Sequence, residues 1–102
     1  MQLTSPSKDG GVDIYATAKG ALGRFLYLVE CKKYGPQQRV QVGIVRQLYG
    51  VVQAKRAAGG VVATTSFFTS GARELQRDLQ FQLSLKDFFA VKEWLEQAAV
   101  TT

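Results

Sequence analysis

Two strand-like runs separated by a turn make up the first third of the chain. Residues 12–18 alternate with β-branched and aromatic side chains, and residues 24–33 (RFLYLVECKK) are the strongest strand-forming run. Strands of this kind have a period of two, and the sequence Gly-Ala-Leu-Gly at 20–23 is typical of a turn. We therefore predict an antiparallel hairpin in which the two turn glycines pair across a two-residue loop.

The rest of the chain alternates between helical and strand-like patterns. The predicted elements are a helix at 41–58 ended by Gly59 and Gly60, a buried strand at 61–65, a helix to about 79 capped by Thr69 or Ser70, a strand at 81–85 and a last helix capped by Asp87. The order ββαβαβα predicts an α/β fold with a mixed sheet flanked by helices. The connection from 24–33 to 61–65 is expected to be a right-handed parallel crossover.

The length of 102 residues is that of one domain. Residues 1–11 are polar and are predicted to be a tail or loop, so the single domain is expected at 12–102. No apolar run has the length of a membrane helix, and the first residues lack the pattern of a signal peptide. Together with a single cysteine, these features predict a cytoplasmic protein that does not enter a membrane.

The net charge of +5 is unevenly distributed along the chain. No acidic residue occurs between Glu30 and Glu74, and the basic residues in that interval are Lys32, Lys33, Arg39, Arg46, Lys55, Arg56 and Arg73. A segment of one sign attracts polyanions, so nucleic acid is the first candidate partner. The alternative is an ordinary solvated basic surface.

Glu30 and Lys32 concentrate the chemistry of the chain. They lie two residues apart in an apolar strand, so both side chains are expected on one face. The predicted hairpin register places Asp13 opposite Glu30, and a slip of two residues would place it opposite Lys32. Val12 and Cys31 are expected on the other face. Buried charges need a partner or a metal, so this group is either a salt bridge that holds the hairpin or a metal-dependent site for phosphodiesters.

The absence of histidine restricts the metal chemistry. Without histidine, and with one cysteine, the sequence excludes Ser-His-Asp triads and the usual zinc sites. A metal would be a hard cation such as Mg²⁺ or Mn²⁺, held by Asp13, Glu30 and the backbone carbonyl of Cys31. Such a metal activates water and polarises a phosphate, and Lys32 is placed to orient the water or stabilise developing charge.

Four sequence blocks in order carry a resemblance to a known family. They are DGGVDI at 9–14, YLVECKKY at 27–34, VGIVRQLYG at 42–50, and ATTSFFT at 63–69 with AREL at 72–75. The chain resembles the Mrr-type restriction endonuclease domain of the PD-(D/E)xK nuclease superfamily from about residue 9 to residue 95. The resemblance implies a restriction-endonuclease-like fold and Mg²⁺-dependent cleavage of DNA. It implies that Asp13 binds metal, that Glu30 fills the second acidic position and that Lys32 is the catalytic lysine.

The resemblance also draws attention to the helix after the strand at 24–33, which flanks the site in the family. Gln47 on this helix is therefore a candidate contact to phosphate or metal-bound water. Lys33, Tyr34, Arg39 and Arg46 are candidate DNA-binding residues, because basic side chains near an aromatic ring suit phosphate contact and base stacking. A solvated loop and an ordinary exposed helix face are the alternatives.

The family core usually begins with a helix and a strand ahead of the Asp-Gly-Gly segment. The sequence predicts neither here, so the strand at 12–18 would have an unpaired edge, and unpaired edges recruit other strands. We therefore expect a homodimer, unless the chain is part of a longer protein. The alternative to an active endonuclease is a non-catalytic nucleic-acid-binding or interaction module with the same fold.

Overall fold

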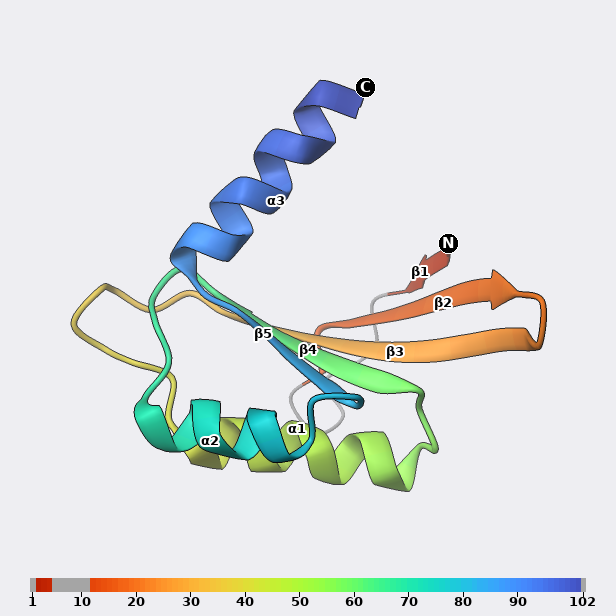
Figure 1. Ribbon diagram of the computed structural model, residues 1–102, viewed down its shortest axis with the longest axis horizontal. Coiled ribbons are helices and arrows are strands. Elements are labelled where there is room, and N and C mark those ends of the chain that lie inside the picture. Colours follow the sequence, from red (N-terminus) through yellow and green to blue (C-terminus); the bar gives the residue numbers. More distant parts are fainter. Residues whose placement is uncertain (1, 5–11, 102) are drawn as a thin grey trace.

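The computed structural model describes residues 2–4 and 12–101, arranged as one five-stranded mixed sheet with helices on either side (Figure 1). The elements are β1 (Gln2–Thr4), β2 (Ile14–Gly20), β3 (Gly23–Lys32), α1 (Val42–Ala54), β4 (Gly59–Thr64), α2 (Ser70–Asp78), β5 (Leu83–Lys86) and α3 (Phe88–Thr101). The strand order in the sheet is β1-β2-β3-β4-β5. From β2 onward the elements follow the predicted order ββαβαβα, so the α/β architecture is confirmed.

Strand β1 corrects the expectation of a tail or loop at the start of the chain. Gln2–Thr4 pair antiparallel with β2, with Leu3 opposite Ala16. They occupy the edge that the sequence predicts to be unpaired, so that edge gives no reason to expect a second copy. Three residues are too few to show a period of two, so this strand cannot be predicted from the sequence pattern. The remainder of the expected tail, residues 1 and 5–11, lies outside the described residues.

The hairpin of β2 and β3 has the predicted register. Gly20 pairs with Gly23 across a two-residue loop. Gly23 has a φ of 116°, a backbone conformation that favours glycine. The paired residues of this ladder end at Ile14 and Val29. Strands β3, β4 and β5 then run parallel to one another, with Glu30 beside Val62 and Val62 beside Leu85, so the predicted parallel crossover through α1 is confirmed.

The hydrophobic core lies between the sheet and helices α1 and α2. Leu28 on β3 and Val62 on β4 are fully buried there. The α1 residues Val45, Leu48 and Val52 bury the matching stripe of that helix, as their helical spacing predicts. Figure 1 shows α1 and α2 side by side under the sheet, whereas α3 starts on the other side and extends away from it.

Helix α1 ends earlier than the sequence predicts. It stops at Ala54, and Arg56 then adopts a left-handed φ of 52°. The N–H of Arg56 donates to the carbonyl of Gln53, and that of Ala57 to the carbonyl of Val52. These two bonds form a Schellman motif, which terminates a helix whatever residue follows. The sequence does not reveal it, because glycine normally occupies the position of Arg56.

The two glycines expected to end α1 belong to β4 instead. A Cβ on Gly60 would lie 3.0 Å from the side chains of Leu48 and Val52, and one on Gly59 would lie 2.9 Å from the carbonyl of Gln82. The glycines therefore let β4 approach both α1 and the segment before β5. Their role is close packing rather than helix termination.

The two predicted helix caps at Thr69 and Asp87 are confirmed. The Thr69 hydroxyl accepts the N–H of Ala72 at 3.2 Å, and the Asp87 carboxylate accepts the N–H of Ala90 at 3.0 Å. Each bond satisfies a donor that the first helical turn leaves without a partner. Within residues 2–4 and 12–101, no helix has the length and apolar character to cross a membrane.

Candidate active site

Glu30 and Lys32 form an ion pair near the end of β3. Glu30 follows Leu28 on the sheet face that α1 covers, and its side chain is 1% exposed. The Lys32 ammonium lies 3.0 Å from Oε2 of Glu30, and the Lys32 side chain is 28% exposed. Apart from this ion pair, neither carboxylate oxygen has a hydrogen-bond partner among the described residues. A buried carboxylate with one cation is under-satisfied, because it can accept several hydrogen bonds.

Burial dominates the electrostatics of Glu30. Desolvation raises the pKa of Glu30, the contact with Lys32 opposes the rise, and the charge of Asp13 adds to it. The pKa of Lys32 is also raised, chiefly by its hydrogen-bonding contact with Glu30. Lys32 is therefore a cation at neutral pH. A further cation near Glu30 would favour the charged carboxylate that burial disfavours.

Asp13 reaches this pair through an irregularity at the end of the hairpin. Ile14 pairs with Val29, and the N–H of Asp13 also donates to the carbonyl of Val29 at 3.0 Å. The regular ladder ends at this pair, and Asp13 lies just before it with its backbone N–H still bonded to β3. The Asp13 carboxylate then accepts the backbone N–H of Cys31 at 2.7 Å. Asp13 is thus anchored to the strand that carries Glu30 and Lys32.

The end of the ladder at Ile14 corrects one detail of the predicted sheet faces. The regular register places Val12 beside Cys31, but Val12 is 2% exposed and belongs to the core with Leu28, whereas Cys31 is exposed. Residues 12 and 13 lie before the first paired residue of β2, so the alternation of the ladder does not fix the side on which they lie. The structure brings Asp13 close to Glu30 through the backbone of Cys31, not by simple alternation.

Cys31 contributes its backbone rather than its thiol. Desolvation, followed by the charges of Asp13 and Glu30, raises the pKa of the Cys31 thiol. The thiol therefore stays protonated at neutral pH and is a poor nucleophile. Because the N–H and C=O of a strand residue point to the same side, the carbonyl of Cys31 faces the same edge as its N–H, where the Asp13 carboxylate lies.

Two threonines at the end of β4 fix the strand end that carries Lys32. The Thr64 hydroxyl donates to the carbonyl of Lys32 at 2.7 Å and accepts the N–H of Ser66 at 3.1 Å. The Thr65 hydroxyl donates to the carbonyl of Tyr34 at 2.9 Å. Both hydroxyls therefore hold the end of β3 and the segment that follows it. Their place at the end of a strand parallel to β3 was the only available signal.

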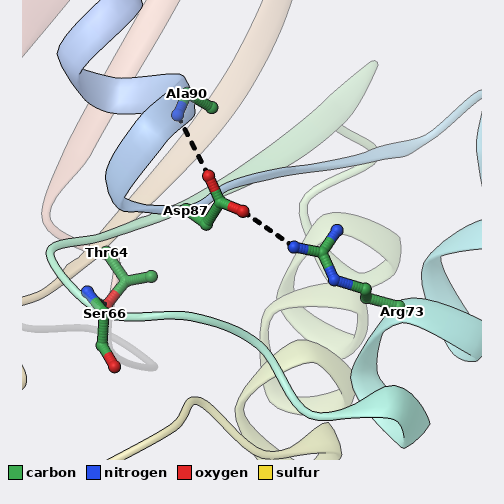
Figure 2. A network of polar contacts seen from close by, with 5 residues as sticks. All are labelled: Thr64, Ser66, Arg73, Asp87 and Ala90. Carbon is green, nitrogen blue, oxygen red and sulfur yellow. Dashed lines mark hydrogen bonds and ion pairs between the residues drawn. The ribbon is translucent and has the colours of Figure 1, made fainter. Parts of the chain in front are cut away.

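A second set of polar contacts connects the same region to both later helices (Figure 2). Asp87 accepts hydrogen bonds from Arg73 of α2 at 2.8 Å and from the N–H of Ala90 in α3. Ser66, drawn in the same view, accepts the N–H of Phe88 through its carbonyl at 2.8 Å. The turn after β4 is therefore bonded to Lys32 on one side and to the start of α3 on the other.

The family model described as a restriction endonuclease, the Mrr catalytic domain, matches residues 1–95. The chain belongs to this restriction endonuclease family. No curated protein matches it.

Two solved structures of restriction endonucleases share the fold of this family member. One is the DNA modification-dependent restriction endonuclease AspBHI, with a TM-score of 0.74 and 27% identity over 99% of this chain. The other is the MspJI restriction endonuclease in complex with a 27-mer oligonucleotide, with a TM-score of 0.66 and 26% identity over 86% of this chain. The matches span only 27% and 20% of those two proteins.

Restriction endonucleases of the PD-(D/E)xK type generally use divalent metal ions, and two carboxylates of this site are of the kind that such ions bind. The described residues contain no group of three His, Cys, Asp or Glu side chains that could hold a metal. Mg²⁺ does not require such a group, because it usually keeps several waters and binds one or two carboxylates plus substrate phosphate. The buried oxygens of Glu30, which lack hydrogen-bond partners among the described residues, and the nearby Asp13 carboxylate are suitable hard ligands.

The other predicted site residues of the restriction endonuclease domain are more scattered. Lys33 and Arg39 are exposed on the segment after β3, and the Arg39 guanidinium lies 6.0 Å from the ring of Phe67. Tyr34 is half-buried and packs against the core, so little of its ring is free for a base. Arg46 and Gln47 are exposed on α1. The contacts expected of these residues with DNA stay predictions.

Proposed function

We propose that this chain is a Mg²⁺-dependent DNA endonuclease of the Mrr restriction type. Its active site for phosphodiester hydrolysis would consist of Asp13, Glu30 and Lys32. The observation that carries the proposal is the buried carboxylate of Glu30, 3.0 Å from the Lys32 ammonium and under-satisfied in hydrogen bonds. A nuclease has a use for such a group, whereas a structural salt bridge needs no second carboxylate beside it. The oligonucleotide in the MspJI complex supports DNA as the substrate.

Asp13, Glu30 and the carbonyl of Cys31 would hold the metal. When bound, Mg²⁺ would polarise the phosphate and acidify a water molecule. The bonds from Cys31 to Asp13 and from Thr64 to Lys32 hold the backbone of the site in place. Lys32 is cationic because its pKa is raised, so its role is to neutralise charge on the phosphate and orient water, not to act as a general base.

The exposed cations beside the site would hold the DNA backbone. Lys33, Arg39 and Arg46 carry no acidic neighbour in sequence, and all three are exposed. Each is proposed to contact phosphate, which fixes the position of DNA without reading its sequence. Neutralising one of them should weaken binding to all duplexes alike and lower the salt slope by about one. Gln47 is proposed to contact the phosphate or its water.

Plasmid nicking by purified variants tests the proposed chemistry. Lys32→Ala and Asp13→Asn should each lower the rate at least about 100-fold, the usual scale for losing a positioned catalytic group. Lys19→Ala is the matched control, because Lys19 is exposed near the far end of the hairpin. Chelation of divalent ions should abolish nicking by the unmodified chain. Full activity of Lys32→Ala or Asp13→Asn would remove this site from consideration.

One observation favours the alternative of a non-catalytic DNA-binding module. The lack of a three-ligand group among the described residues means that the metal depends on two carboxylates and the substrate. If the unmodified chain binds DNA with a steep salt dependence but cuts nothing in Mg²⁺ or Mn²⁺, this second function replaces the first. Binding and cleavage measured on the same plasmid separate the two.

Assembly and location belong to the same proposal. A homodimer would place one site on each DNA strand, and the exposed apolar residues Trp94 and Leu95 of α3 offer a surface for it. A domain within a longer chain is the alternative, since the solved relatives are several times longer. Sedimentation equilibrium at micromolar concentration decides between a dimer and a monomer of 11.2 kDa. The proposed location is the cytoplasm.

A further inference from the structure

Three phenylalanine rings gather where the turn after β4 meets the start of α3. The ring centroids of Phe67, Phe88 and Phe89 lie 5.5–6.4 Å apart, within the range of interacting aromatic pairs. Phe88 is 39% exposed and Phe89 is 68% exposed. The rings thus contact one another while leaving much of their surface in water, so they are not an ordinary part of the core.

These rings are connected to the candidate active site by backbone hydrogen bonds. The N–H of Thr65 donates to the carbonyl of Lys32 at 3.3 Å, and the N–H of Phe88 donates to the carbonyl of Ser66 at 2.8 Å. Phe67 follows Ser66 directly in the chain. The aromatic group is therefore built on the turn that is bonded to the strand end carrying Lys32.

The surroundings of the rings are cationic. The Arg39 guanidinium lies 6.0 Å from the centroid of Phe67, and Lys92 lines a shallow hollow of about 260 Å³ beside Phe88. The nearby carboxylate of Asp87 is engaged by Arg73 and by the cap of α3. A surface that combines aromatic rings with cations suits a polyanion that carries planar groups, which describes a single strand of nucleic acid.

We propose that Phe67, Phe88, Phe89 and Arg39 form a stacking platform for an unpaired nucleobase of DNA. Bases of an intact duplex are already stacked and paired, so the ligand is a base in a single-stranded overhang, a frayed end or a locally opened site. Every base has an aromatic face, so the platform accepts them without sequence preference. The inference deepens the proposed nuclease function, because the stacked base would belong to the strand held at Lys32.

Fluorescence anisotropy of labelled oligonucleotides tests the platform without any cleavage step. The 102-residue chain is titrated, in chelator, with an oligothymidylate, with the same length of abasic strand and with a blunt duplex. Phe89→Leu keeps an apolar side chain but removes the ring, and Phe89→Tyr keeps the ring. Phe81→Leu is the matched control, because Phe81 is 92% exposed at the opposite ends of the parallel strands.

We expect Phe89→Leu to weaken oligothymidylate binding about tenfold, the scale of one lost base stack, and to change duplex and abasic binding less than about twofold, within the range of a surface change that removes no contact. Phe89→Tyr and Phe81→Leu should bind oligothymidylate like the unmodified chain. Equal oligothymidylate affinity of Phe89→Leu and the unmodified chain overturns the platform. An equal loss for all three ligands also overturns it, since the ring would then serve only to seat α3.

The same variants separate this inference from the proposed nuclease function. If Lys32→Ala loses plasmid nicking while Phe89→Leu binds oligothymidylate normally, the platform fails and the nuclease stands. If the unmodified chain never cuts but Phe89→Leu loses the preference for unpaired bases, the nuclease fails and the platform stands on a binding module. If the unmodified chain binds none of the oligonucleotides, both are wrong.

Discussion

Helices α1 and α3 have similar length and apolar content, but α1 is buried against the sheet and α3 is largely exposed. Helix α1 buries Val45, Leu48 and Val52 almost completely against the sheet. Helix α3 leaves Trp94 51% exposed and Leu95 67% exposed, and Figure 1 shows it pointing away from the sheet. The difference follows from their places in the chain: α1 connects two parallel strands and must cross the sheet, whereas α3 follows β5, the last strand in the sheet order.

This difference determines the chemistry of the site. Helix α1 covers the sheet face that carries Leu28, and Glu30 lies two residues further along that face. Glu30 is therefore desolvated and its pKa is raised. Helix α3 covers little, and the rings at its start stay accessible. The covered side thus supplies the buried, desolvated carboxylate, and the uncovered side supplies a surface for a ligand.

The largest expected effect tests the difference in burial between α1 and α3, by truncating one leucine of each helix to alanine. Leu48→Ala should lower the free energy of unfolding by about 2–5 kcal/mol, the cost of a cavity in a packed core. Leu95→Ala should change it by less than about 0.5 kcal/mol, as for other surface substitutions. Urea denaturation of both variants measures the contrast. Similar losses in both would mean that α3 is packed in solution, by a second copy or another segment.

The next largest effect is expected from removing the partner of the buried carboxylate. Lys32→Met should lower the free energy of unfolding at neutral pH by about 2 kcal/mol, because it leaves Glu30 buried without its cation. Lys19→Met at an exposed position serves as the control. An unchanged free energy of unfolding would show that water, rather than Lys32, satisfies Glu30.

The pH dependence gives the sign of the Glu30 effect. The folded-state pKa of Glu30 is raised above the ordinary value of 4.5, so the folded state holds this proton more tightly than the unfolded state. The resulting contribution to stability is complete below about pH 4.5 and is lost as the pH rises through the folded-state pKa. As the pH rises through that pKa, the free energy of unfolding of the unmodified chain should fall relative to that of Glu30→Gln. The opposite trend in urea titrations would contradict a burial-dominated Glu30.

A smaller effect is expected where α1 meets β4. Gly60→Ala should lower the free energy of unfolding by about 1–2 kcal/mol, because the new Cβ would press on Leu48 and Val52 at 3.0 Å. Gly50→Ala is the control, since a Cβ on this α1 glycine meets nothing within 4 Å. That control should stabilise the chain slightly. Thermal melting compares them, and equal shifts would show that α1 moves freely on the sheet.

The smallest effect concerns the end of α1. Arg56→Gly should raise the free energy of unfolding by about 0.5–1 kcal/mol, because glycine adopts a left-handed φ without the penalty of a side chain. Lys55→Gly, at a right-handed position next to it, should lower it. If both changes are destabilising, the side chain of Arg56 makes a contribution that outweighs its backbone strain.

Much of the site could be predicted because strand periodicity is local. The glycines at 20 and 23 and the alternation around them specify the hairpin register. Two positions apart on a strand means one face, so Glu30 and Lys32 had to be neighbours. The helix caps at Thr69 and Asp87 could also be predicted, because capping depends on a side chain and a backbone N–H only three residues away.

The rest depended on contacts between distant segments. Regular pairing ends at Ile14, and beyond it Val12 lies in the core while the Asp13 carboxylate accepts the backbone N–H of Cys31. The bond from Thr64 to Lys32 exists only because β4 runs parallel to β3 in one register. The sequence by itself thus determined which charges share a strand, through local geometry. Only the tertiary structure decided which of them is buried, because burial is a property of the helix that crosses above.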